Sequence, residues 1–233
     1  MYEAVHAAPD GESTVARMAL TAAECGFDGI VVRNHVDARA DYDASGIEEA
    51  YGVDIVEGIE IRAESPEQAS GYLGANREDH VVLAVHGGTK ALNRFAVSQD
   101  RVDVLSHPTR NGGTVDQVIA REAATHGVHL EFDLSPVLRA DGGTRVQALR
   151  RLRTMYDLVD HYDVPYVVSA DPTSHLQVRA PRELAALGDV IGLGAEFVRE
   201  GLREWGRLAE RNRERLSDEF IEPGVRKGRY DER

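Results

Sequence analysis

The feature that most limits the fold is a unit of one short apolar strand and one helical stretch, repeated along the chain. The strand-like runs begin roughly every 26 residues over the first six repeats, the spacing of a strand–helix unit. Runs that are apolar on both faces, such as residues 81–85, are typical of a buried parallel sheet. We therefore predict seven parallel strands, at residues 3–6, 29–33, 54–62, 80–86, 102–106, 128–134 and 164–170.

Turn and capping residues mark the ends of these units. Gly26, Gly52 and Gly127 each stand where a helix would stop, just before the next strand. Ser65, followed by a proline and a glutamine, predicts a capping box at a helix start, and Thr114 predicts a second one. Both signals agree with the strand–helix period.

A sheet of this kind closes into a barrel or stays open in a doubly wound fold. The chain has no Gly-x-Gly-x-x-Gly motif to support the open form, so we predict a closed or nearly closed (β/α) TIM-like barrel over residues 1–194. An eighth strand is expected near residues 189–193. A C-terminal helix at residues 195–217 should pack on the barrel, and we expect residues 218–233 to form a basic, flexible tail.

Potential metal ligands stand at or just after the ends of almost all the predicted strands. The carboxyl ends of the strands meet at one face of a barrel, so these side chains should lie together. One interpretation is a hydrolytic site with two or three divalent ions that activate water. The other is the remnant of such a site, held by hydrogen bonds, and spacing alone favours neither. The residues are His6, His35, Glu60, His86, His107, Glu131, Asp133 and Asp171.

The charge and composition narrow the class of protein. Forty acidic against 27 basic residues give a net charge of −13, and only Lys90 and Lys227 are lysines. Such a surface suits molar salt, so we predict a halophilic source, in preference to an ordinary acidic protein from a GC-rich genome. Cys25 is the only cysteine, and we find no secretory signal or membrane-spanning run. We expect a cytoplasmic globular protein without a membrane partner.

Two arginine clusters stand out against this acidic background. One recurs every fourth residue in the C-terminal helix, where the arginines form either ion pairs with glutamates, each worth about 0.2–0.5 kcal/mol, or phosphate contacts. The other lies on a net-positive helix around Arg150, which indicates a contact surface. The first cluster is Arg199, Arg203, Arg207, Arg211 and Arg215; the second is Arg145, Arg150, Arg151 and Arg153, with Arg139 just upstream of that helix.

Several passages, taken in order, carry a family resemblance. They are residues 9–11, 26–35, 57–61, 102–108, 127–134, 167–171 and 179–187. Together they resemble the 30 kDa subunit family of archaeal and eukaryotic ribonuclease P, called protein component 3 in archaea, in a haloarchaeal version. The resemblance runs from Tyr2 to about Pro223, and order and spacing carry it rather than any single motif.

That family is similar to the polymerase-and-histidinol-phosphatase metallo-phosphoesterases, which are barrels with metal ligands at strand ends. Those enzymes open with a His-x-His motif, where this chain has only His6. Their Asp-x-His motif becomes Asp171-Pro172-Thr173, with His175 two residues beyond. Losing two imidazoles should weaken metal binding sharply. The resemblance thus implies a degenerate site, with no metal held by His6, His35, Glu60, His86, His107 or Asp171.

The resemblance also implies a role. In ribonuclease P the RNA subunit removes the 5′ leader of precursor tRNA with Mg²⁺ held by the RNA. Component 3 acts with component 2 to support that RNA. The chain would belong to an endoribonuclease without being catalytic alone or binding a cofactor, and its partners would be the ribonuclease P RNA, component 2, other protein subunits and, through the holoenzyme, precursor tRNA.

Two functions remain to be distinguished. The first is an RNA-binding subunit. The second is a metal-dependent phosphoesterase with His6, His86, His107 and Asp171 as ligands. The residues predicted to contact RNA are Arg110, Asn111, Arg139, Arg145, Arg150 and Arg151.

Overall fold

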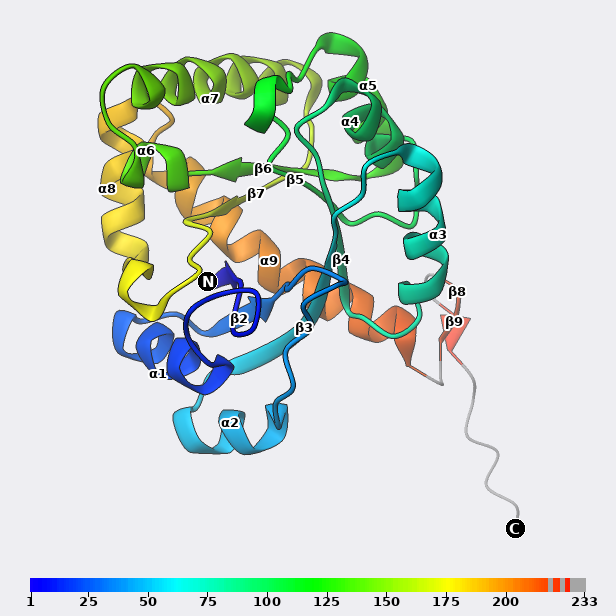
Figure 1. Cartoon of the computed structure of the whole chain (residues 1–233), viewed down its shortest axis with the longest axis vertical. Helices are drawn as coiled ribbons and strands as arrows, with labels where there is room; N and C mark the ends of the chain where they lie inside the picture. Colours follow the sequence, from blue (N-terminus) through cyan, green and yellow to red (C-terminus); the bar gives the residue numbers. More distant parts are fainter. Residues whose placement is uncertain (218–219, 223–224, 227–233) are drawn as a thin grey trace.

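Seven strands form one parallel sheet in the order β1 to β7, with most helices arranged around its outside (Figure 1). The computed structural model describes residues 1–217, 220–222 and 225–226. All seven predicted strands and the nearly closed TIM-like barrel are confirmed. The strands are β1 (Tyr2–Val5), β2 (Gly29–Val32), β3 (Asp54–Ile61), β4 (Val82–His86), β5 (Val104–Ser106), β6 (His129–Asp133) and β7 (Tyr166–Ser169).

The helices begin and end largely where the capping signals predict. Gly26, Gly52 and Gly127 adopt left-handed φ values of 86°, 68° and 67° and end α1, α2 and α5. Ser65 caps α3, accepting a hydrogen bond from the Gln68 backbone. The helices are α1 (Val15–Cys25), α2 (Ala44–Tyr51), α3 (Pro66–Asn76), α4 (Lys90–Val97), α5 (Gln117–His126), α6 (Ser135–Arg139), α7 (Gly142–Tyr162), α8 (Pro181–Ile191) and α9 (Ala195–Leu216).

Two local predictions are wrong. Thr114 does not cap α5; the cap is Asp116, whose carboxylate accepts hydrogen bonds from the backbones of Val118 and Ile119 at 3.0 Å. A short carboxylate directly before the first turn reaches both amides, so the helix starts there. Residues 189–193 form no strand, because residues up to Ile191 complete α8 and bury its apolar face at helical spacing.

Side chains of the strands alternate between two cores. The outward residues, such as Ile30, Leu83 and Leu130, pack beneath the surrounding helices. The inward residues near the strand starts, among them Ala4 and Val31, form a separate small cluster that also includes side chains of α9. Farther along the strands, the inward positions become polar, and they form the site described below.

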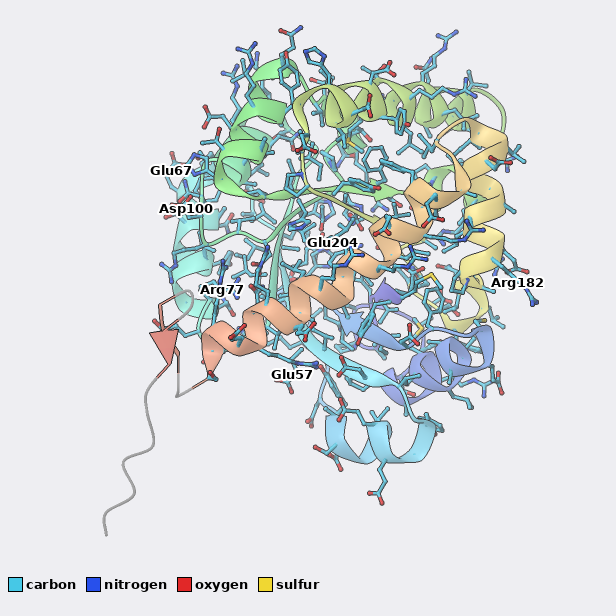
Figure 2. All side chains as sticks on the ribbon, turned by 180° about the vertical axis from the view of Figure 1, so that it is seen from behind. Glu57, Glu67, Arg77, Asp100, Arg182 and Glu204 are labelled. Atoms are coloured by element: carbon cyan, nitrogen blue, oxygen red, sulfur yellow. The ribbon has the colours of Figure 1, made fainter. Side chains whose placement is uncertain are left out.

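Helix α9 takes the place that an eighth strand would occupy. It packs against β1 and β7, and Figure 2 shows it crossing the sheet from behind, with Glu204 on its length. Trp205 is fully buried among the inward residues, and its indole N–H donates to the Val168 carbonyl of β7 at 2.9 Å. The helix therefore supplies the hydrogen bonds and apolar surface that close the inside of the barrel.

The seam between β1 and β7 is sealed by a carboxyl group. Glu3 is fully buried, and its Oε1 accepts hydrogen bonds from the backbones of Ala4 and Ala170. One backbone bond, from His6 N–H to the Pro172 carbonyl at 3.1 Å, joins the strand ends directly. Burial raises the pKa of Glu3 to about 8, so this carboxyl is neutral at pH 7.

Beyond α9, the structure describes a short antiparallel pair, β8 (Phe220–Glu222) and β9 (Val225–Arg226). The rest of the predicted tail over residues 218–233 lies outside the described residues, so its flexibility stays a prediction. Within the part of the chain that the structure covers, no helix is both long and apolar enough to cross a membrane.

Candidate functional site

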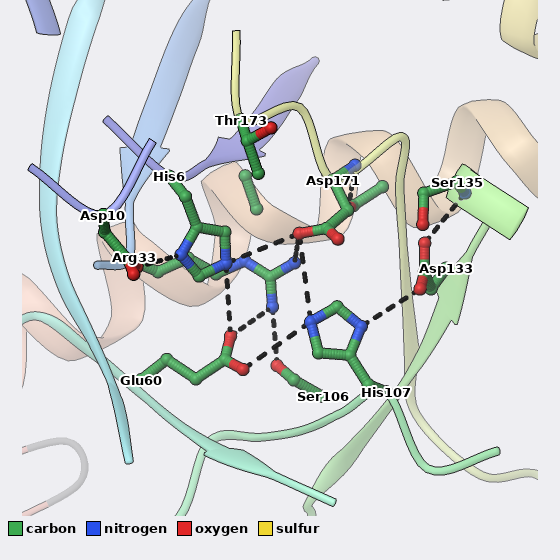
Figure 3. A network of polar contacts seen from close by, with 12 residues as sticks. His6, Asp10, Arg33, Glu60, Ser106, His107, Asp133, Ser135, Asp171 and Thr173 are labelled. Carbon is green, nitrogen blue, oxygen red and sulfur yellow. Dashed lines mark hydrogen bonds and ion pairs between the residues drawn. The ribbon is translucent and has the colours of Figure 1, made fainter. Parts of the chain in front are cut away.

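The predicted strand-end residues do meet at one face of the barrel. His6 follows β1, Glu60 lies on β3, His107 follows β5 and Asp171 follows β7, and all four are buried. Figure 3 shows their side chains turned toward a common centre. His35, His86, Glu131 and Asp133 join them from β2, β4 and β6.

A residue that the sequence reasoning did not single out lies at that centre. Arg33, which follows β2, is fully buried, and its guanidinium contacts carboxylates from three other strands. Its Nη1 donates to Glu60 at 2.8 Å, and its Nη2 donates to Glu131 at 2.6 Å and to Asp171 at 3.1 Å. Nη1 also reaches Ser106 Oγ at 2.6 Å. Arg33 thus places a positive charge among the carboxylates at the mouth of the barrel.

The guanidinium lies between the carboxylates and the apolar floor of the barrel. Its Cζ is 5.7 Å from the centroid of the Trp205 ring, a cation–π contact. Burial disfavours the charged form, but Glu131, Glu60 and Asp171 outweigh it and raise the pKa of Arg33 above its ordinary value. This arginine therefore carries a permanent charge.

Two carboxylates orient the imidazoles from behind. Asp10 Oδ2 lies 2.7 Å from His6 Nδ1 and 2.8 Å from His35 Nδ1. Asp133 Oδ2 lies 3.1 Å from His107 Nδ1. The Nε2 atoms of His6 and His107 consequently point to the centre.

The charge state of the site follows from these contacts. Burial opposes a charged His6, but hydrogen bonds to Asp10 and Asp171 raise its pKa to about 9. The pKa of His107 is also raised, since surrounding carboxylates outweigh its burial. The pKa of Glu60 is held well below its ordinary value, against burial, by Arg33 and His107. At neutral pH the site is a network of ionised carboxylates balanced by cationic side chains.

Three sets of side chains in this network have ligand atoms within 4.8 Å of one another: His6, His107 and Asp171; His35, Glu60 and His86; and His6, Asp10 and His35. They nevertheless do not fit a polynuclear metal site. At least one oxygen atom each of Glu60, Glu131 and Asp171 already accepts a hydrogen bond from Arg33, and this guanidinium, which is positively charged like a metal ion, lies among them. His175 does not contribute, since its Nδ1 pairs with Ser13 at 2.9 Å.

The loop after β5 brings a second arginine over the site. Arg110 donates to Asp133 at 2.8 Å and to Asp171 at 2.6 Å, and about a third of its side chain stays exposed. Asn111 is exposed, with φ of 50°. Arg139 donates to the Asp171 carbonyl at 2.7 Å. The predicted RNA contacts of this loop thus border the buried network, and they stay predictions.

The other predicted RNA-contact residues lie on α7. Arg145 and Arg150 are exposed, and the Arg150 guanidinium makes no hydrogen bond or ion pair with any described residue. Arg151 is exposed as well and donates to the Thr109 carbonyl at 3.0 Å, which ties α7 to the loop after β5. A pocket between that loop and α7 is lined by Asn111, Thr144, Gln147 and Arg151 among others.

On α9 the ion-pair interpretation holds for three arginines. Arg203 donates to Glu196 and Glu200 at 2.8 Å, and Arg207 pairs with Glu200 and Glu204. Arg199 pairs with Glu196. These guanidiniums are already partnered on the helix surface, whereas that of Arg150 has no partner within residues 1–217, 220–222 and 225–226.

Comparisons with known proteins agree with this geometry. The family model described as RNase P subunit p30 matches residues 1–217. Ribonuclease P protein component 3 of Haloarcula marismortui is 58% identical over 226 residues, covering 97% of this chain and 96% of that protein. The same search finds the component 3 of Methanosarcina barkeri at 35% identity, covering 90% of this chain and 88% of that protein.

Among solved structures, a chain from the cryo-EM structure of archaeal ribonuclease P with mature tRNA matches with a TM-score of 0.84 at 21% identity, over all of both chains. Histidinol phosphate phosphatase from Lactococcus lactis, complexed with zinc, L-histidinol and phosphate, matches with a TM-score of 0.51 at 8% identity, over 91% of this chain and 93% of that one. At these identities, both likenesses concern the fold.

Proposed function

The chain belongs to the RNase P subunit p30 family and is therefore a protein subunit of ribonuclease P; we propose that it supports the catalytic RNA of that enzyme without performing the cleavage itself. The family match over residues 1–217 carries this conclusion. The reaction of the holoenzyme is the removal of the 5′ leader from precursor tRNA. The role of the subunit is to lower phosphate repulsion, so that the RNA folds at lower Mg²⁺.

The RNA-contact surface in this proposal is the outer face of α7 with the adjoining loop after β5. Arg150 supports it because its guanidinium is exposed and has no partner among the residues that the structure describes, in an acidic protein. Arg151 and Asn111 border the pocket beside it. Arginine suits this role, since its planar group forms paired hydrogen bonds with phosphate.

We further propose that the protein binds no cofactor and that the Mg²⁺ used in catalysis is held by the RNA. The placement of Arg33 among Glu60, Glu131 and Asp171 supports this proposal, because its guanidinium takes at least one oxygen atom of each carboxylate and already supplies a positive charge there. The alternative function, a phosphoesterase using His6, His86, His107 and Asp171, has no such support.

The remaining partners in the proposal are component 2, the other protein subunits and, through the holoenzyme, precursor tRNA. We infer a cytoplasmic location, because the relatives are archaeal ribonuclease P components and archaea have no organelles.

Affinity purification of the tagged full chain from its native host tests the proposal. Sequencing of the bound RNA should find ribonuclease P RNA enriched, and the eluate should cleave precursor tRNA. His107→Ala should leave that cleavage intact, since His107 takes no part in the chemistry. An RNA-free protein with phosphoesterase turnover that His107→Ala abolishes would contradict it.

A further inference from the structure

We propose that Arg33 is a built-in replacement for a divalent cation, and that removing its guanidinium turns the mouth of the barrel into a binding site for a single Zn²⁺ held by His6, His107 and Asp171. This inference concerns the barrel alone and goes beyond the role in ribonuclease P. Its outcome does not depend on RNA binding.

One carboxylate oxygen, Asp171 Oδ1, lies where the ligands of a metal site would meet. Asp171 Oδ1 lies 3.4 Å from His6 Nε2 and 3.8 Å from His107 Nε2, so two imidazoles and a carboxylate converge on it. The same Oδ1 accepts the hydrogen bond from Arg33 Nη2 at 3.1 Å. The guanidinium therefore takes the ligand atom at which a three-residue metal site would form.

The imidazoles of His6 and His107 are each held by a carboxylate on the side that faces away from Asp171. Each turns its Nε2 inward because a carboxylate holds its Nδ1: Asp10 for His6 and Asp133 for His107. A carboxylate behind a histidine is the arrangement that orients metal-bound imidazoles in proteins. Two histidines and one carboxylate are a ligand set that suits Zn²⁺. The outer shell of a metal site is thus present around an inner cation that is not a metal.

The negative charge of the buried carboxylates must be balanced by a cation. Glu60, Glu131 and Asp171 are buried, and carboxylates buried without a cation are strongly unfavourable. Arg33 supplies that cation permanently, and its guanidinium lies over the fully buried Trp205 ring, with Cζ 5.7 Å from the ring centroid. A divalent ion meets the same requirement, so the arginine and the metal are alternatives for one place.

Zinc titration of purified protein in molar KCl, followed by elemental analysis after gel filtration, tests this inference. Wild-type protein and Arg33→Lys, which keeps a cation, should retain no stoichiometric Zn²⁺. Arg33→Met should retain about one equivalent, and its midpoint of thermal unfolding should rise when ZnCl₂ is added. Adding His107→Ala to Arg33→Met should weaken Zn²⁺ binding at least tenfold, because losing a ligand should cost no less than the roughly 10–100-fold loss that follows removal of a group that only orients a ligand.

A matched control is His126→Ala in the Arg33→Met background, because His126 lies on α5 and pairs with Asp100 away from the barrel mouth. It should leave Zn²⁺ binding unchanged. Folded Arg33→Met that takes up no Zn²⁺, or Zn²⁺ binding lost with His126 but not with His107, would overturn the inference. So would a wild-type equivalent of Zn²⁺ that His107→Ala removes.

If Arg33→Met does not fold on its own, the same test is made during refolding. Recovery of helical ellipticity when Zn²⁺ is present, and not when it is withheld, supports replacement of the guanidinium by a metal. No recovery in either buffer, while Arg33→Lys refolds normally, contradicts it.

Discussion

At the scale of single residues, two buried groups make the stability of the barrel depend on pH. The pKa of His6 is raised from 6.5 to about 9, and that of Glu3 from 4.5 to about 8. For each, the folded state binds its proton more tightly than the unfolded state. The stabilisation is complete below the ordinary pKa and is lost as the pH rises through the raised value.

We therefore predict that the free energy of unfolding falls between about pH 5 and pH 9, with both groups contributing from pH 6.5 to 8. Glu3→Gln keeps the hydrogen-bond acceptor and cannot ionise, so it should flatten the part of the profile below pH 8. Denaturant melts at several pH values measure this. Glu49→Gln, at an exposed position of α2, is the control and should leave the profile unchanged. A Glu3→Gln profile as steep as that of the wild type would contradict a neutral Glu3.

At the scale of the elements, α9 is the part of the fold on which the inside of the barrel depends. Trp205→Ala removes a fully buried side chain from the inner cluster and the bond to Val168, so we predict a loss of about 3–5 kcal/mol in the free energy of unfolding. Chemical denaturation measures it. Arg207→Ala on the exposed face of the same helix should cost under about 1 kcal/mol. Equal losses for the two variants would show that α9 does not anchor the barrel through Trp205.

Most of the strands and helices could be predicted from the sequence. The period of strand and helix, with glycine at the helix ends, is local information, and it was enough for seven strands and α9. The burial of Trp205 inside the barrel could not be predicted, because no local pattern indicates that a helix enters the barrel. The same limit led to the wrong strand at residues 189–193, where the barrel is completed not by a strand but by α9, the helix that follows directly.

Most residues of the candidate site could be predicted from the sequence, but the residue at its centre, Arg33, could not. Residues at strand ends converge by topology, so His6, Glu60, His107 and Asp171 could be named in advance. Arg33 was included in a strand and given no role, since an arginine after a strand normally lies in solvent. Its burial is decided by Glu60, Glu131 and Asp171, which come from three other strands.

At the scale of the whole molecule, the net charge of −13 should make folding depend on salt. Unscreened repulsion among carboxylates opposes a stability that is only about 5–15 kcal/mol for typical domains. We predict that the isolated protein loses helical ellipticity below roughly molar KCl, where circular dichroism during a KCl titration would detect it. A profile that stays flat down to low salt would remove the argument for a halophilic protein.

In the proposed function, the protein contacts RNA through α7 and performs no chemistry. The most direct measurement is precursor-tRNA cleavage by the reconstituted holoenzyme at several Mg²⁺ concentrations. Arg150→Glu with Arg151→Glu should raise the Mg²⁺ requirement, while Arg203→Glu with Arg207→Glu, whose guanidiniums are already paired on α9, should change it much less. Thermal unfolding controls for folding; Arg150, Arg151 and Arg207 are exposed, and Arg203 is partly exposed. Unchanged cleavage by the α7 variant, together with loss of cleavage by the α9 variant, would contradict the account.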